Sequence, residues 1–135
     1  MPTMQTVRTM IGTHPAETGV DRALLARVVD LAVACSTACT VCADACLAEE
    51  QVADMRRCIR TDLDCADVCA ATARVVARQT EYSADVTRAV VQACATACRT
   101  CAEECGSHTD EHCRVCAQAC RDCLEACEEL LAAIG

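Results

Sequence analysis

Apolar residues recur three and four positions apart along most of the chain, and short polar segments divide this pattern into four long stretches. Such spacing places the apolar side chains on one face of an α-helix. The predicted helices run from a cap at Thr18 or Asp21 to about Ala48, from about Asp54 to about Gln79, from about Ala84 to about Cys105, and from a cap at Ser107 or Thr109 to about Ile134. Short loops between successive helices imply antiparallel neighbours, so we predict an all-α fold, an antiparallel up-down-up-down four-helix bundle.

The first 19 residues are expected to form a separate segment. A short N-terminal helix is followed by a loop over Gly12–Gly19 that contains Pro15. We therefore divide the chain into an N-terminal segment, residues 1–19, and a bundle, residues 20–135. The total of 135 residues suits one domain.

The start of the chain carries no sign of an export signal. The stretch Met1–Gly12 contains Arg8 and lacks the apolar segment of a signal peptide. No apolar run approaches the roughly 18 residues of a membrane span. We therefore expect a cytoplasmic protein without membrane contact. In that reducing compartment, many cysteines indicate metal or redox chemistry rather than disulfides.

Cysteine takes the place of the usual large core residues. The chain has 16 cysteines and one aromatic residue, Tyr82. Its net charge is −8, and it contains no lysine. Without a basic stripe or aromatic stacking surfaces, it is not expected to bind nucleic acid. No Ser/His/Asp arrangement, phosphate loop or paired-carboxylate site is present either, so we expect no catalytic residue and no enzyme activity.

The cysteines follow one another at alternating steps of three and four, with one longer gap in the second helix. They are Cys35, Cys39, Cys42 and Cys46 in the first predicted helix, Cys58, Cys65 and Cys69 in the second, Cys94, Cys98, Cys101 and Cys105 in the third, and Cys113, Cys116, Cys120, Cys123 and Cys127 in the fourth. This spacing places them on one seam of each helix, facing the bundle axis. Asp62 fills the missing step in the second helix.

Antiparallel packing predicts that the four seams meet in layers. The expected layers are Cys46, Cys58, Cys105 and Cys113; then Cys42, Asp62, Cys101 and Cys116; then Cys39, Cys65, Cys98 and Cys120; then Cys35, Cys69, Cys94 and Cys123; with Cys127 beginning a fifth.

The two ends of this column differ in the residues they carry. One end, the apolar end, carries Leu24, Val28, Leu31, Val76, Val91, Leu130 and Ile134. The other, the histidine end, carries Met55, His108 and His112. Because Met and His are metal ligands, we expect metal ions to reach the column at the histidine end.

A thiolate-lined core favours soft metal ions. Copper(I) accepts two or three thiolates and tolerates bridging sulfurs, so about one Cu(I) per thiolate is expected. One cation per thiolate leaves the loaded core nearly neutral, which avoids the high cost of an unpaired charge in a dry interior. Without metal, the buried thiols should be protonated and pack as small hydrophobic groups. Asp62 is a poor Cu(I) ligand, and we expect it to tune the site through hydrogen bonding or proton exchange, or to pair with Arg60 or Arg114.

The segments CSTACTVCADAC (35–46), CATACRTCAEEC (94–105) and CRVCAQACRDCLEAC (113–127) resemble the cytosolic bacterial copper storage proteins. The resemblance extends from about residue 20 onward. It implies a four-helix bundle that assembles into homotetramers and holds many Cu(I) ions in each core. It also implies that copper enters beside His108, His112 and Met55. Separately from the resemblance, we expect a small copper chaperone as the delivery partner. Asp62 occupies a position at which family members can carry cysteine.

Two other functions stay open from the residues alone. A zinc or general soft-metal buffer would use closed sites of about four ligands, and so hold about four ions per chain. An Fe–S electron carrier would also need about four cysteines per cluster. A continuous seam of cysteines suits a chain of Cu(I) ions better than either.

Overall fold

The structure is a computed structural model that describes residues 3–134, and side chains from residue 5 onward. The described residues form helices and no strand. The helices are α1 (Thr3–Gly12), α2 (Arg22–Leu47), the 3-10 helix η1 (Val52–Met55), α3 (Arg56–Ala77), α4 (Ala84–Gly106) and α5 (Glu111–Ile134). The all-α prediction is therefore confirmed.

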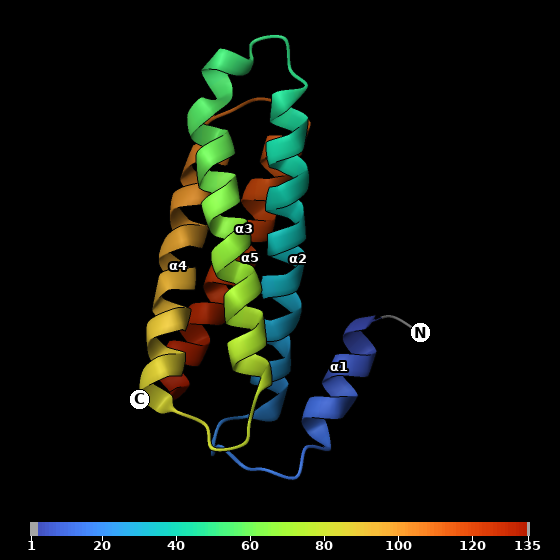
Figure 1. Ribbon diagram of the computed structural model, residues 1–135, viewed down its shortest axis with the longest axis vertical. Helices are drawn as coiled ribbons and strands as arrows, with labels where there is room; N and C mark the ends of the chain where they lie inside the picture. Colours follow the sequence, from blue (N-terminus) through green and yellow to red (C-terminus); the bar gives the residue numbers. More distant parts are fainter. Residues whose placement is uncertain (1–2, 135) are drawn as a thin grey trace.

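The four long helices pack side by side in the predicted up-down-up-down order (Figure 1). Helix α2 packs against α3 and α5, and α4 packs against the same two helices. Each long helix thus turns one face to the bundle axis. Helix α1 lies outside the bundle against α2. The boundary between the 1–19 segment and the bundle stays a prediction.

Local capping explains where the helices begin and end. Asp21 caps α2 by accepting a hydrogen bond from the backbone N–H of Ala23, and Ser83 caps α4 in the same way through Val86. The alternative cap, Thr18, instead accepts a bond from Val20. Among these candidates, side-chain hydrogen bonding selects the residue directly before each helix.

Two predicted boundaries were wrong by one helical turn or less. Helix α5 begins at Glu111 and not at Ser107 or Thr109. The backbone N–H groups of Ser107 and His108 bond back to the carbonyls at the end of α4, so these residues extend that helix end. Helix α3 ends at Ala77, and the buried side chain of Gln79 donates to the carbonyl of Val76.

At the apolar end, the core is built from more than the predicted seam. Val28, Val76, Val91 and Leu130 are buried as predicted. Leu24, Leu31 and Ile134 are only partly buried. Leu25, Val29 and Ile11 are buried instead, because α1 packs against α2 and covers its outer side.

Two arginines attach the N-terminal segment to α2. Arg22 donates hydrogen bonds to the carbonyls of Ile11, Gly12 and Ala16. Arg8 pairs with the buried carboxylate of Asp30 at 3.5 Å. Burial raises the pKa of Asp30, and the charge of Arg8 opposes that shift.

Helix α2 is the one described helix that is long and apolar enough to cross a membrane by length and composition. The expectation that no stretch approaches a membrane span was therefore wrong for this helix. However, α2 packs against α3 and α5, and a buried core helix passes the same test. This feature is thus weak evidence for a membrane span.

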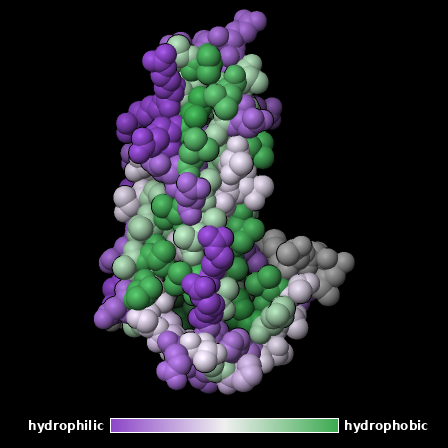
Figure 2. Space-filling model, viewed as in Figure 1, coloured by the Kyte–Doolittle hydropathy of each residue, from purple (hydrophilic) through white to green (hydrophobic). Residues whose placement is uncertain are grey.

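Apolar side chains also reach the surface, where they lie between polar ones (Figure 2). The exposed large apolar residues are Met10, Val33, Val41, Leu47, Val52, Leu63, Val86 and Val115. They are spread over several helices, and single exposed residues of this kind are normal.

Leu130 and Val33 test how the apolar end contributes to stability. Leu130 is fully buried, so Leu130→Ala should lower the free energy of unfolding of the metal-free protein by about 2–5 kcal/mol. The control, Val33→Ala on the exposed side of α2, should change it by about 0.5 kcal/mol or less. Urea unfolding of the reduced protein measures both. Equal effects would contradict a structural role for the apolar end.

Candidate metal centre

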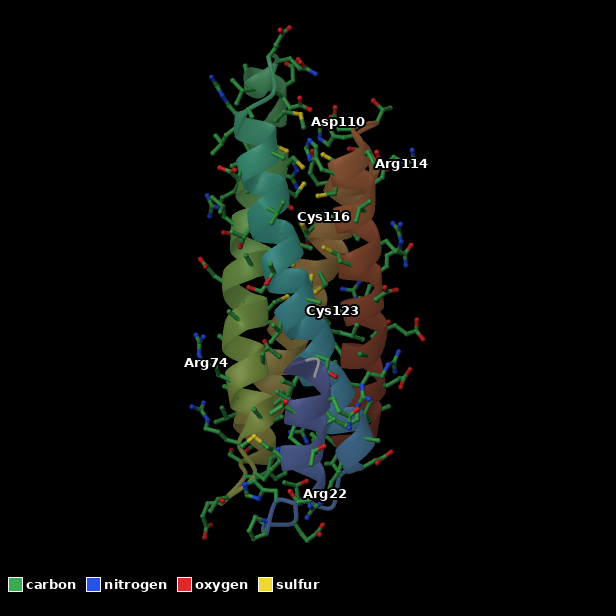
Figure 3. The ribbon with its side chains drawn as sticks, turned by 90° about the vertical axis from the view of Figure 1, so that its right-hand side faces the viewer. Arg22, Arg74, Asp110, Arg114, Cys116 and Cys123 are labelled. Carbon is green, nitrogen blue, oxygen red and sulfur yellow. The ribbon has the colours of Figure 1, made fainter. Side chains whose placement is uncertain are left out.

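All sixteen cysteines are buried free thiols, gathered along the bundle axis. Figure 3 shows their sulfur atoms between the helices, with Cys116 and Cys123 labelled. Neighbouring sulfurs lie 3.5 Å apart for Cys58 and Cys105, and 3.7 Å apart for Cys69 and Cys94. These contacts join residues of different helices, so the column depends on the packing of the whole bundle.

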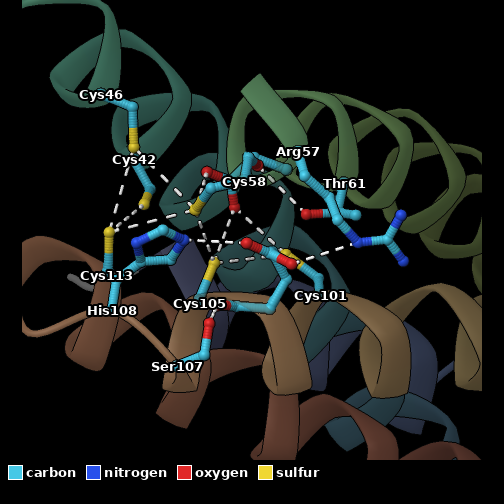
Figure 4. Close-up of polar contacts among 12 residues, drawn as sticks. Cys42, Cys46, Arg57, Cys58, Thr61, Cys101, Cys105, Ser107, His108 and Cys113 are labelled. Carbon is cyan, nitrogen blue, oxygen red and sulfur yellow. Dashed lines mark hydrogen bonds and ion pairs between the residues drawn. The ribbon is translucent and has the colours of Figure 1, made fainter. Parts of the chain in front are cut away.

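The predicted first layer is present. The sulfur of Cys46 lies 3.9 Å from that of Cys58 and 4.0 Å from that of Cys113, while Cys58 also contacts Cys105 (Figure 4). The four helices therefore bring these cysteines together at the histidine end.

Further from the histidine end, the cysteines are staggered and do not form the predicted flat layers. The sulfur of Cys39 lies 3.7 Å from both Cys116 and Cys120, which were predicted in different layers. It also lies 3.9 Å from Cys101. The Cys39 sulfur of α2 therefore lies level with the space between two successive cysteines of α5. One sulfur then faces two steps of the next helix.

Overlapping groups of four ligand atoms lie close enough to hold metal ions. In each group, the atoms all lie within 4.8 Å of one another. They include Cys35, Cys69, Cys98 and Cys123; Cys35, Cys39, Cys65 and Cys120; Cys39, Cys101, Cys116 and Cys120; Cys42, Cys46, His112 and Cys113; and Cys42, Cys46, Cys58 and Asp62. Several cysteines belong to two groups. Shared ligands suit bridging sulfurs along a chain of ions better than separate closed sites.

Asp62 is completely buried among thiols. Its Oδ1 accepts hydrogen bonds from Cys101 at 3.1 Å, Cys105 at 3.3 Å and Cys116 at 3.4 Å. Burial, followed by the interaction with Cys101, raises the pKa of Asp62 to about 12. The carboxyl group is therefore protonated at neutral pH.

The expectation that Asp62 pairs with an arginine was wrong. Arg60 pairs with Asp64 on the outside of α3, at 3.0 Å. The Asp62 side chain points the other way, toward the sulfurs of α4 and α5. Its position on the seam, rather than its charge, decides its partners.

The two histidines occupy different positions. His112 Nδ1 lies 3.5 Å from the sulfur of Cys42 and 3.6 Å from that of Cys113, so this ring faces the thiol column. His108 instead places its Nε2 2.8 Å from Glu104, and Glu104 also pairs with Arg57 (Figure 4). Of the two, His112 is the one in hydrogen-bonding distance of thiols.

Burial and hydrogen bonding shift the pKa values of side chains at the histidine end. Burial raises the pKa of the thiols of Cys46 and Cys113. The hydrogen bond with Cys42 raises the pKa of His112, and Glu49 adds to this shift. Met55, from η1, is buried within the same apolar cluster as the cysteines.

Sequence reasoning missed the roles of Glu49 and Glu104. Each accepts or shares a proton at the outer nitrogen of a histidine, Glu49 at 3.3 Å from His112 and Glu104 at 2.8 Å from His108. The place of Glu104, four residues before His108, was a usable signal. Glu49 lies 63 residues from His112, and no local pattern links them.

Comparison with known proteins finds relatives of the same kind. The family model for "Copper storage protein" matches residues 21–132. The copper storage protein Ccsp from Streptomyces lividans, in a structure loaded with 10 copper equivalents, is 58% identical. The match covers 94% of this chain and 98% of that one, with a TM-score of 0.92.

Two further relatives extend this result. A structure of copper loading to a cytosolic copper storage protein from Streptomyces lividans, with five coppers, is 60% identical with a TM-score of 0.85, covering 87% of this chain and all of that one. The "Uncharacterized cysteine-rich protein YhjQ" of Bacillus subtilis (strain 168) is 36% identical over 90 residues, which are 67% of this chain and 80% of that protein.

The raised pKa of Asp62 predicts how stability depends on pH. The folded protein holds this proton more tightly than the unfolded chain, so the contribution of Asp62 is greatest below pH 4 and is lost as pH rises. Relative to Asp62→Asn, the metal-free protein should lose up to about 1.4 kcal/mol of stability per pH unit between pH 5 and 7. Urea unfolding of both proteins at the two pH values measures the difference. Parallel profiles would contradict a protonated Asp62.

Proposed function

The chain belongs to the copper storage protein family, and on this basis we propose that it stores multiple Cu(I) ions in the cytoplasm, on the thiolates that line its bundle core. The observation that carries this proposal is the continuous column of sixteen buried free thiols. Their overlapping groups support many ions per chain rather than a few isolated ones.

We assign the ligands as follows. The sixteen cysteines hold Cu(I), and Met55, His108 and His112 serve at the histidine end, where copper enters. His112 has the strongest support, because its Nδ1 lies beside two thiols. Asp62 tunes the neighbouring thiols through the hydrogen bonds that it accepts.

Charge balance explains how one core serves both the empty and the loaded protein. In the empty protein, neutral thiols pack as small hydrophobic groups, so the bundle can fold without metal. During loading, each Cu(I) replaces a thiol proton, and the net charge of the core hardly changes. The protein therefore exchanges ions without leaving unpaired charges in its interior.

Zinc buffering and Fe–S electron transfer are less well supported. Both need about four ligands per separate site, whereas the sulfurs here are shared between neighbouring groups. The related Streptomyces lividans structures are described with copper. We therefore consider zinc buffering and Fe–S electron transfer less well supported than copper storage, and we propose no catalytic role.

We also propose a homotetramer, supplied with copper by a small copper chaperone. The homotetramer rests on the resemblance to the copper storage proteins, and the chaperone is the delivery partner that we expect for a copper store.

Copper capacity tests the proposed function. Reduced metal-free protein, titrated anaerobically with Cu(I) against a chromophoric chelator, should keep the chelator copper-free up to about one equivalent per cysteine, or about 16 in all. Competition that begins near four equivalents would instead favour closed sites of the zinc kind. Metal analysis of the isolated protein for zinc and iron is the companion measurement.

Proton release tests the protonation of the empty core. Because burial in an apolar core favours the neutral form of a thiol, loading with Cu(I) supplied as an acetonitrile complex should release about one proton per ion at pH 7. Titration in a weakly buffered solution with a pH indicator measures this ratio. A ratio near zero would mean that the thiols are already ionised before copper binds.

A further inference from the structure

A groove on the outside of the bundle, between α2 and α5, leads to the thiol column. We call it the α2–α5 groove; it has a volume of about 460 Å³. The side chains of Val41 and Val115 form its walls, and Cys42, His112 and Cys116 also line it. The groove therefore joins the protein surface to three potential copper ligands.

The exposure of the cysteines agrees with this position. Cys42 and Cys116 are each 1% exposed, whereas the other fourteen cysteines are 0% exposed. Both of these residues line the α2–α5 groove. The thiols nearest to solvent therefore lie at the side of the bundle.

The tip of the histidine end is more tightly closed. Cys46, Cys58, Cys105 and Cys113 form the outermost layer of thiols, and all four are completely buried. Met55, from η1, is buried within the same cluster. An ion that approached along the bundle axis would have to displace this packing, whereas the groove brings solvent next to Cys42 and Cys116.

His112 stands between the groove and the column. It is partly exposed, and its Nδ1 faces Cys42 and Cys113. Its other ring nitrogen, Nε2, lies 3.3 Å from the carboxylate of Glu49. A carboxylate at the outer nitrogen holds a histidine ring in one orientation, so Glu49 keeps Nδ1 directed at the thiols.

We propose that Cu(I), handed over by the thiolates of its carrier, enters the column sideways through the α2–α5 groove, with Glu49 as the positioning residue for His112. The proposal rests on the storage function above. The apolar side chains of Ala38, Val41 and Val115 suit a soft ion with few water ligands, while Glu111 adds one carboxylate to the lining of the groove. The route thus adds selectivity before any ion reaches the core.

The transfer is a ligand exchange in which copper stays Cu(I). Two copper–sulfur bonds to the carrier thiolates break, while bonds to Cys42 Sγ and His112 Nδ1 form. The proton of Cys42 passes to one released carrier thiolate. The second carrier thiolate leaves as the anion, so the ion with the Cys42 thiolate and the His112 imidazole is neutral. Cys116, once it holds a neighbouring ion as a thiolate, then replaces His112 by bridging the two ions. His112 is left free for the next ion.

Loading kinetics of variants test the route. Reduced metal-free protein is mixed anaerobically with the Cu(I)–glutathione complex in a stopped-flow instrument, and the ultraviolet absorbance of copper–thiolate bonds is followed. Val115→Trp should slow loading by about tenfold or more, because the indole fills the groove and raises the barrier to passage. Its final copper capacity should equal that of the unsubstituted protein.

Two matched controls place tryptophan at other exposed valines. Val86→Trp, near the apolar end, and Val52→Trp, in η1 at the histidine end, should load within about twofold of the unsubstituted rate. If Val52→Trp slows loading as much as Val115→Trp does, or if Val115→Trp has no effect, the sideways route is wrong. Val115→Ala, which widens the groove, should load faster, and it decides the question if Val115→Trp does not fold.

The role of Glu49 has its own test. Glu49→Ala should slow loading without lowering capacity, and Glu49→Gln, which can still hydrogen-bond the ring, should restore most of the rate. Equal slowing by both variants would overturn the positioning role. The copper capacity distinguishes failure of the storage function from failure of the entry route. A capacity near four ions would overturn storage, whereas full capacity with unchanged loading rates in the variants would overturn only the route.

Discussion

The burial of sixteen thiols in one core is the constraint on which the rest of the structure depends. A thiol is small and weakly polar, so it can fill a helical interior as a hydrophobic group would. A thiolate in the same place needs a cation beside it. The same seam therefore serves as packing in the empty protein and as a ligand set in the loaded one. The near absence of aromatic residues follows from this double use, because large rings would occupy the space between the sulfurs.

Asp62 shows how the core tolerates a polar group. Its carboxyl group is protonated, and it accepts hydrogen bonds from thiols of α4 and α5. It is neutral, like the thiols around it, so it adds no charge to the empty core. At the opposite end, Val28, Val76, Val91 and Leu130 close the bundle with ordinary apolar packing. Stability is thus concentrated at the apolar end, and ligand chemistry at the histidine end.

Two carboxylates outside the column contact the histidines of the histidine end. Glu49 and Glu104 contact the outer nitrogens of His112 and His108, from α2–η1 and α4 respectively. His112 is thereby directed at the thiols, while His108 stays with its glutamate and the nearby Arg57. Because of this difference and the α2–α5 groove, the histidine end is not symmetric about the bundle axis, and the groove lies on one side of it. Ion transfer then depends on the packing of α2 against α5.

The sequence by itself determined the helices, the seam and the kind of ligand, because steps of three and four are a local property of the α-helix. It also determined that Met55, His108 and His112 lie at the end opposite Val28, Val76, Val91 and Leu130, since antiparallel order follows from short loops. Tertiary structure alone decided the stagger that places Cys39 between Cys116 and Cys120, the partner of Asp62, and the contact between Glu49 and His112. It also decided that α1 buries Leu25 and Val29 in place of Leu24 and Leu31. These features depend on the axial displacement and rotation of whole helices against one another, which no single stretch of sequence encodes.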